Sequence, residues 1–115
     1  MLFRSGSLPF GDLPVEYRPW SEATEVADLQ TADIGLVPVP DHPWSRYKLF
    51  FKTLQLMAMG LPVVASRIGA NCDIIEHGTN GLLATTESEW VDSLRALIED
   101  PGLRTRIGQI GRAHV

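Results

Sequence analysis

Cysteine is nearly missing from this chain of 115 residues, since Cys72 is the only one present. A single cysteine excludes an internal disulfide and suits a reducing compartment, so we expect a cytoplasmic protein. Long hydrophobic runs are lacking as well, because no apolar stretch reaches the ~18 to 20 residues that cross a bilayer. The amino-terminal segment also lacks the apolar core of a signal peptide, and we therefore expect neither secretion nor a membrane span.

Positive charge is also in short supply. The chain carries 10 Lys and Arg against 14 Asp and Glu, which gives a formal net charge of −4 and a pI near 5.2. Proteins that bind nucleic acid need a basic surface, so the composition predicts no nucleic-acid partner. The apolar share of 44% is instead typical of a globular domain with a hydrophobic core.

Several sequence signatures of well-known chemistry are missing. Neither G-x-G-x-x-G nor a Walker sequence occurs, and no serine lies in a nucleophile elbow. The 3 histidines have no second histidine or cysteine at the spacing of a metal site, so we expect no metal and no cofactor. The expected function is therefore one that needs neither a metal ion nor a cofactor.

What the sequence does contain is a regular exchange of strand-like apolar runs and amphipathic helical segments. The strand-like runs show little polar alternation, which is typical of strands buried on both faces. Strands that alternate with helices predict an α/β fold, here a Rossmann-like parallel sheet with helices on both faces. We expect strands over residues 15–18, 34–39, 62–66 and 81–84. We expect helices over 21–32 with Ser21 as the cap, over 48–59 and 73–76, from the capping box at 86 and 89 to 100, and a short one from 103.

Two of the predicted helices carry apolar stripes at helical spacing, and these stripes should face the core. The stripe of the 48–59 helix consists of Phe50, Leu54, Met57 and Ala58. That of the helix after the capping box consists of Trp90, Val91, Leu94, Leu97 and Ile98. Gly60, with Pro62 close behind it, should end the 48–59 helix as a C-cap.

The 48–59 helix also has a polar face. Lys48, Lys52 and Gln55 stand at i, i+4 and i+7 and so line one side of the helix. A helix start already favours anions, and lysines strengthen that preference. Because parallel sheets bind ligands beyond the carboxyl ends of their strands, we predict a diphosphate or sugar-phosphate site near Val39–Lys52 and Ser66–Asn71. A solvated polar face on an amphipathic helix is the alternative that spacing alone leaves open.

The loop that follows the 62–66 strand contains two further residues of interest. Gly69 would let the backbone approach a ligand closely, and Asn71 would cap the short helix that follows. Ordinary loop chemistry explains both residues equally well, so this loop alone predicts no site.

Longer segments of the sequence resemble one enzyme family. LQLMAMGLPVVAS (Leu54–Ser66) resembles the segment written roughly as L-E-A-M-A-x-G-x-P-V-V-A-S in GT-B retaining glycosyltransferases of family 4, the glycosyl transferases group 1. IGANCDIIEHGTNGLLA (Ile68–Ala84) is similar to the G-x-x-E-I-I-x-x-G-x-N-G-x-L that follows in the family. The likeness extends through YRPW, ADIGLVPVPDHPW and SEWVDSLRALIEDPGLRTRIG, and the first two of these resemble a bacterial branch.

The resemblance implies a donor-binding domain and its site residues. Two glutamates with seven residues between them contact the nucleotide sugar in the family, and here the second falls on Gln55 and the first on Tyr47. An amide can still hydrogen-bond the ribose diol. The end of the 15–18 strand falls where the family seats the base. The implied nucleotide-sugar-binding residues are Lys48, Phe50, Phe51, Lys52, Gln55, Tyr47, Arg18 and Pro19.

In such enzymes a sugar passes from a nucleotide donor to an acceptor with retention and without a metal. The acceptor site and part of the catalytic machinery lie in an N-terminal domain. We therefore expect residues 6–109 to form part of a C-terminal donor-binding domain that is inactive alone. Its expected partners are a nucleotide-diphosphate sugar and the missing N-terminal domain of the same protein. A non-catalytic nucleotide-binding or interaction module of Rossmann-like fold is the alternative.

Both ends of the chain look foreign to this pattern. Leu2–Ser5 is what the codons CTC TTC CGA TCT encode, and Ile110–Val115 is what ATC GGA AGA GCA CAC GTC encodes. Both DNA strings occur in common sequencing adaptors. We expect residues 1–5 and 110–115 to be non-native, and re-sequencing the source DNA across both junctions tests this.

Overall fold

The computed structural model describes residue 19, residues 21–42 and residues 50–115. The chain divides into two compact units, Met1–Thr31 and Ala32–Val115. The strand expected over residues 15–18 and the first two residues of the helix expected over 48–59 lie outside the described residues. The remaining expectations can be compared with the structure.

The described part of the first unit holds one helix, α1 (Glu25–Gln30), which is shorter than the helix expected over 21–32. Its N-cap is Thr24 rather than Ser21, and no side chain caps it. The carbonyl oxygen of Ser21 instead accepts the N–H groups of Thr24 at 3.1 Å and Glu25 at 2.9 Å. Residues 22–24 therefore form a hydrogen-bonded turn, whereas the sequence predicts that they belong to the helix.

The second unit is built on a three-stranded parallel sheet in the order β1-β2-β3. Its strands are β1 (Gly35–Val37), β2 (Val63–Ser66) and β3 (Leu82–Ala84). Gly35 pairs with Val63, and Val64 pairs with Leu82. All residues of β2 and β3 are buried, as continuous apolar runs predict for parallel strands. The three strands expected after residue 33 are thus confirmed. β2 and β3 are each one residue shorter than predicted, and β1 has half the predicted length.

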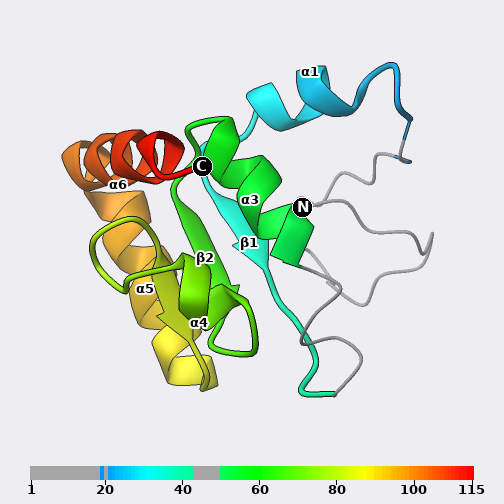
Figure 1. Ribbon diagram of the computed structural model, residues 1–115. Coiled ribbons are helices and arrows are strands. Elements are labelled where there is room, and N and C mark those ends of the chain that lie inside the picture. Colours follow the sequence, from blue (N-terminus) through cyan, green and yellow to red (C-terminus); the bar gives the residue numbers. More distant parts are fainter. Residues whose placement is uncertain (1–18, 20, 43–49) are drawn as a thin grey trace, which may run out of the picture. The chain divides into compact units, whose positions relative to one another are not determined.

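The described part of this unit contains four helices. They are α3 (Phe50–Ala58), α4 (Asn71–Ile74), α5 (Glu87–Glu99) and α6 (Pro101–Ala113). Helix α3 packs on β1 and β2, α5 packs on β2 and β3, and α6 contacts both α3 and α5. In Figure 1 α3 and α5 flank the strands on opposite sides. This is the predicted fold class, a parallel sheet with helices on both faces.

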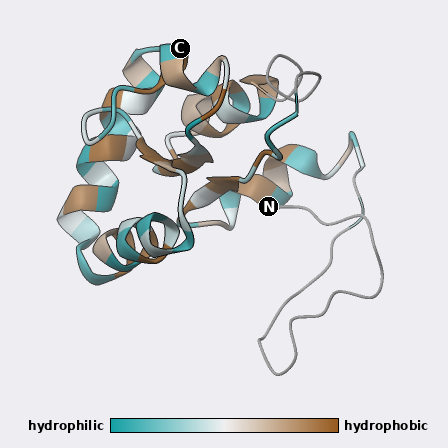
Figure 2. Cartoon of the chain, turned by 90° about the horizontal axis from the view of Figure 1, so that it is seen from below, coloured by the Kyte–Doolittle hydropathy of each residue, from teal (hydrophilic) through white to brown (hydrophobic). Residues whose placement is uncertain are grey.

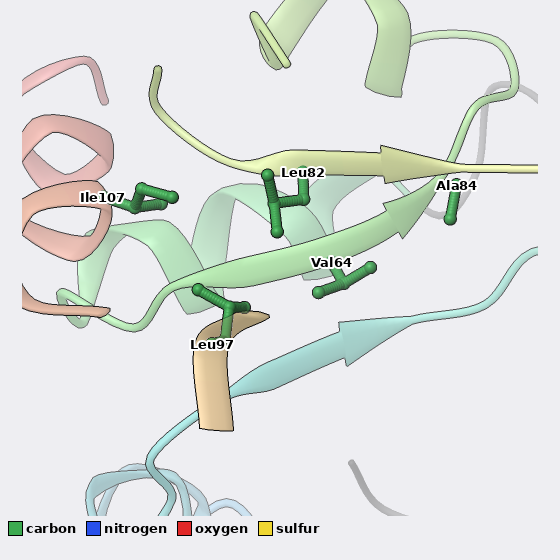
Figure 3. Close-up of a cluster of buried hydrophobic side chains, with 5 residues drawn as sticks. All are labelled: Val64, Leu82, Ala84, Leu97 and Ile107. Atoms are coloured by element: carbon green, nitrogen blue, oxygen red, sulfur yellow. The ribbon is translucent and has the colours of Figure 1, made fainter. Parts of the chain in front are cut away.

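One face of the sheet packs against α5 and α6 through an aliphatic cluster. Val64, Leu82 and Ala84 enter it from β2 and β3, and Leu97 of α5 and Ile107 of α6 meet them (Figure 3). Leu97 and Ile107 have no exposed surface. In Figure 2 the strands are brown, which marks hydrophobic residues, whereas the helices alternate brown with the teal of hydrophilic residues. Burial of this cluster holds α5 and α6 on the sheet.

The buried side of α5 differs from the stripe that the sequence predicts. Val91 and Ile98 belong to that stripe, yet they are 45% and 63% exposed. Ser93, which interrupts the apolar pattern, is buried instead. The side turned to the core consists of Trp90, Ser93, Leu94 and Leu97. A predicted stripe of five apolar residues was wider than the sheet could cover.

The opposite face of the sheet packs against α3, and here the backbone and the helix come close. A Cβ atom added to Gly35 of β1 would lie 2.9 Å from Cδ1 of Leu56, so any larger residue would displace the Leu56 side chain. Successive residues of a strand point to opposite faces, and Gly35 precedes Leu36, which packs on the aliphatic cluster. Helix α3 therefore covers one face of β1, and the aliphatic cluster covers the other.

The apolar stripe predicted for α3 is corrected by the structure. The buried residues of this helix are Thr53, Leu56 and Met57. Of the predicted stripe only Met57 is buried, while Phe50 and Leu54 are half-buried and Ala58 is exposed. A stripe chosen by apolar residues alone leaves out Thr53, because threonine has the size of valine but carries a hydroxyl.

The segment between β2 and β3 contains only one turn of helix. We expected it over residues 73–76 with Asn71 as its cap, but α4 begins at Asn71 and its N-cap is Ala70. Gly60, after α3, has a φ of 77°, which fits the C-cap that the sequence predicts there. Gly69 also has a positive φ, of 56°, in the loop that leaves β2.

The last helix, α6, is longer than the short helix that the sequence predicts. Oδ1 of Asp100 accepts the N–H of Leu103 at 3.0 Å, and Pro101 occupies the first helical position. Proline at that position begins a helix, so the same residues that end α5 also start α6. Further along, Gly108 lies against the backbone of Gly60, where a Cβ atom would collide with the carbonyl oxygen.

Candidate functional site

A groove of about 510 Å³ opens at the carboxyl ends of all three strands. Its walls come from residues 38–41 after β1, residues 66–68 at and after the end of β2, and residues 84–85 at and after the end of β3. Trp90 of α5 lines one side. This is the edge at which open parallel sheets bind ligands. The groove therefore lies at the end of the sheet where the sequence predicts a site.

Arg67, the residue directly after β2, contributes a positive charge to the groove. Its guanidinium donates from Nη2 to the carbonyl oxygen of Leu83 at 3.4 Å, and its backbone N–H donates to the carbonyl oxygen of Ala84 at 3.0 Å. Because Arg67 is exposed, its charge remains largely solvated. The side chain is thus held along β3 while presenting a cation at the groove.

A second ionisable group stands at the start of α5. The pKa of Glu89 lies below its ordinary value of 4.5, first because the backbone N–H of Thr86 donates to the carboxylate and then because Thr85 does so too. Arg67 adds a smaller attraction that also lowers this pKa. The carboxylate closes a capping box, since Oγ1 of Thr86 accepts the N–H of Glu89 at 3.1 Å. The capping box predicted from the sequence is confirmed.

Behind the groove a chain of buried hydrogen bonds joins three segments. The backbone N–H of Val39 donates to Oγ of Ser66 at 2.7 Å. Nδ2 of Asn71 donates to the carbonyl oxygen of Ser66 at 3.2 Å. Oγ1 of Thr53 donates to Oδ1 of Asn71 at 2.7 Å. We call Thr53, Asn71 and Ser66 the polar relay. Ser66 takes part with its hydroxyl toward Val39 and with its carbonyl oxygen toward Asn71, so the relay links the end of β1, the end of β2 and helix α3.

Helix α3 carries four of the five predicted donor-site residues that the structure describes. Nζ of Lys52 donates to Oε1 of Gln55 at 3.3 Å, so both side chains lie on one face of the helix, as their spacing predicts. Both residues are half-buried. A cation and an amide side by side can bind a phosphate oxygen and a hydroxyl group, respectively.

Two of the aromatic residues assigned to the donor site begin the same helix. The rings of Phe50 and Phe51 stack with centroids 4.3 Å apart and an interplanar angle of 28°. Phe51 is 69% exposed, so it is not needed to fill the core. Four of the predicted site residues, Phe50, Phe51, Lys52 and Gln55, are therefore neighbours on one helix.

The other predicted site residues lie outside the described residues or in the first unit. Lys48, Tyr47 and Arg18 lie outside the described residues. Pro19 is exposed and belongs to the first unit, Met1–Thr31. Their part in the site remains a prediction.

Histidine and metal chemistry find no support among the described residues. His77 has a structural bond, because its Nδ1 accepts the N–H of Leu83 at 2.9 Å. Within residues 21–42 and 50–115, no three His, Cys, Asp or Glu side chains gather as ligands for a metal ion. Nor does any helix in the described part of the chain have the length and apolar character needed to cross a membrane.

The sequence interpretation missed the polar relay. Asn71 was expected to cap a helix, whereas its side chain instead joins β2 to α3. A signal was present, because Thr53 interrupts the apolar residues of α3 at a position where helical spacing places the core. Such a residue needs a hydrogen-bond partner when it is buried.

Comparison with known proteins places these features in a family context. The model of the family described as glycosyl transferases group 1 matches residues 15–100. A D-inositol 3-phosphate glycosyltransferase of Pseudarthrobacter chlorophenolicus is 40% identical over 100 residues, covering 85% of this chain and 23% of the relative. One with the same name from Corynebacterium jeikeium is 36% identical over 99 residues, covering 84% and 22%. The chain thus spans about a quarter of the length of these curated relatives.

Solved structures agree on the fold. The C-terminal domain of a glycosyl transferase group 1 family protein from Francisella tularensis superposes with a TM-score of 0.67 and 27% identity, over 86% of this chain and 50% of that one. Sucrose-phosphate synthase from Thermosynechococcus elongatus gives a TM-score of 0.64 and 24% identity, over 76% and 21%. The second likeness concerns the fold alone.

Proposed function

The chain belongs to the glycosyl transferases group 1 family, and on that premise we propose that it supplies part of the nucleotide-sugar donor site of a retaining glycosyltransferase. The reaction proposed for the whole protein moves a glycosyl group from a nucleotide-diphosphate sugar to an acceptor. Placement in family 4 and in a bacterial branch is part of the proposal. It is supported by the motifs within Leu54–Ala84 and by the relatives from Pseudarthrobacter and Corynebacterium.

The observation that carries this proposal is the polar face of α3. Lys52 and Gln55 hydrogen-bond one another, and the relay ties their helix to the carboxyl ends of β1 and β2. A diphosphate gains most from an ammonium group that is partly withdrawn from water, and a ribose diol can pair with an amide. We assign Lys52 to the diphosphate and Gln55 to the ribose, with Lys48 as a second cation.

The remaining assignments are proposed on family likeness. Tyr47, Phe50 and Phe51 would border the sugar, and Arg18 and Pro19 would border the base. Residues 6–109 would form part of the C-terminal domain, and the protein would act in the cytoplasm. Because the chain spans 23% of the Pseudarthrobacter relative, we propose that the acceptor site lies in another part of a longer protein. The 115-residue chain should then transfer no sugar by itself.

Isothermal titration of the chain with UDP, GDP and their nucleotide sugars tests the donor site. Lys52→Ala should weaken binding by about tenfold or more, because it removes a charge-assisted hydrogen bond. Gln55→Ala should weaken it by about fivefold, which is the size of a neutral hydrogen bond. Arg106→Ala and Gln109→Ala are the matched controls at exposed positions of α6, since the first also removes one positive charge and the second makes the same change as Gln55→Ala.

Three results would contradict parts of this proposal. A wild-type chain that binds none of these nucleotides has no donor site. Binding that falls equally in Lys52→Ala and Arg106→Ala would reduce the effect to net charge. Sugar transfer by the 115-residue chain, followed by release of UDP or GDP, would refute the claim that it is inactive alone.

A further inference from the structure

We propose that Thr53, Asn71 and Ser66 are positioning residues, whose relay sets the rotation of α3 and so holds Lys52 and Gln55 toward the donor. This inference rests on the proposed function and adds residues that the family motifs did not assign. It also gives a reason for polar groups in the core beneath α3.

The relay crosses the carboxyl edge of the sheet without a break. It starts at the backbone of Val39, passes through Ser66 at the end of β2 and Asn71 at the start of α4, and ends at Thr53 in α3. No residue of the relay is more than 7% exposed, since Ser66 has that value, Asn71 has 3% and Thr53 has 0%. Water therefore does not compete for these bonds, and each bond fixes the distance between two segments.

The direction of the threonine hydroxyl is informative. In a helix, threonine commonly donates to the carbonyl oxygen four residues earlier, which is a bond within the same element. The Thr53 hydroxyl donates instead across to Asn71, 18 residues further along the chain. Valine has nearly the same shape and would fill the space without a buried polar group to satisfy. A hydroxyl at this position adds a directional link that an apolar side chain lacks.

Helix geometry explains what this link controls. At about 100° per residue, Thr53 lies roughly 130° around the helix from the middle of the face formed by Lys52 and Gln55. A rotation of the helix by about 20° would move an atom ~6 Å from its axis by ~2 Å. Hydrogen bonds to a phosphate or a hydroxyl tolerate a few tenths of an ångström, so loss of the relay would misplace both groups.

The test uses the 115-residue chain and the titration with UDP and GDP. Thr53→Val removes the hydroxyl and keeps the shape, whereas Thr53→Ser keeps the hydroxyl and loses a methyl group. Ile107→Val is the matched control, because it weakens the core on the other face of the sheet. Urea midpoints rank the stability of each variant, and amide hydrogen exchange over residues 50–58 reports the order of α3.

We expect Thr53→Val to weaken nucleotide binding on the order of five- to tenfold and to speed exchange in α3. Thr53→Ser should keep the affinity within about twofold of wild type. Ile107→Val should leave the affinity unchanged even if its urea midpoint falls as far as that of Thr53→Val. Rescue by serine separates positioning from stability, because serine restores the bond but leaves a packing defect. If Thr53→Val does not fold, Asn71→Ala, which removes both side-chain bonds that tie α3 to the end of β2, is judged by the same criteria.

Two results overturn the inference, and they differ from each other. If the wild-type chain binds UDP or GDP and Thr53→Val loses no more affinity than Ile107→Val, the positioning role is wrong while the donor site stands. If the wild-type chain binds neither nucleotide, the proposed function fails and the positioning role fails with it.

Discussion

On the side of the sheet covered by α5 and α6, Val64, Leu82 and Leu97 meet in an aliphatic cluster. On the side covered by α3, a glycine of β1 and a buried threonine stand among the apolar residues. The first arrangement asks only for hydrophobic side chains of suitable volume. The second asks for particular atoms at particular places, which is the arrangement expected where a helix must be held for binding rather than merely buried.

The aliphatic face should give the largest loss of stability. Leu97→Ala removes a side chain with no exposed surface and should lower the free energy of unfolding by about 2–5 kcal/mol, through lost burial and the cavity that remains. That is a large part of the ~5–15 kcal/mol that stabilises a typical domain. Urea unfolding followed by circular dichroism measures the loss.

Ile98→Ala is the control for this prediction, because the neighbouring side chain is 63% exposed and should cost no more than about 0.5 kcal/mol. Equal losses at the two positions would mean that the cluster is not the core of this unit. Nucleotide affinity should change little in either variant, since both residues lie on α5 rather than on α3.

The α3 face should respond to added volume instead of lost volume. Gly35→Ala places a methyl group 2.9 Å from Cδ1 of Leu56, and should destabilise by about 1–3 kcal/mol. Its second expected effect is weaker nucleotide binding, because the helix that carries Lys52 must move away from β1. The same unfolding and titration measurements check both effects.

A size exchange sharpens this test. Leu56→Val makes room for the new methyl group, so the double variant Gly35→Ala/Leu56→Val should lose less than the sum of the two single losses. Strictly additive losses would show that Gly35 and Leu56 do not share one contact. The comparison between the two faces would then lose its packing basis.

The sequence predicted the sheet better than the sides of its helices. Continuous apolar runs specify buried parallel strands, and all three expected after residue 33 occur. Helix faces were less predictable because apolarity at helical spacing does not indicate which residues the neighbouring elements reach, as Ile98 and Ala58 demonstrate. The length of α6 was missed because Pro101 begins a helix and was taken to separate two.

The candidate site divides along similar lines. Residues within one helix could be placed from spacing alone, and the bond between Lys52 and Gln55 agrees with that. Contacts between segments distant in the chain could not, because no local pattern indicates that Thr53 meets Asn71. The assignments of Lys48, Tyr47 and Arg18 fall outside the described residues and stay predictions.

The smallest expected effect concerns the exposed cap of α5, where polar bonds stand in solvent rather than in the core. Folding lowers the pKa of Glu89 below 4.5, chiefly through the N–H groups of Thr86 and Thr85. A carboxylate with a lowered pKa stabilises the fold above the pKa of the unfolded chain, and that contribution is lost as pH falls through the folded pKa. Glu89→Gln retains an acceptor oxygen but not the charge, so its melting temperature should lie slightly below wild type at pH 7. The two curves should converge once the pH has fallen below the lowered pKa that Glu89 has in the folded chain. A difference that stays constant from pH 7 to the acid limit of folding would mean that charge plays no part in this cap. A difference as large as that of Leu97→Ala would erase the contrast between the solvent-exposed cap and the buried aliphatic core.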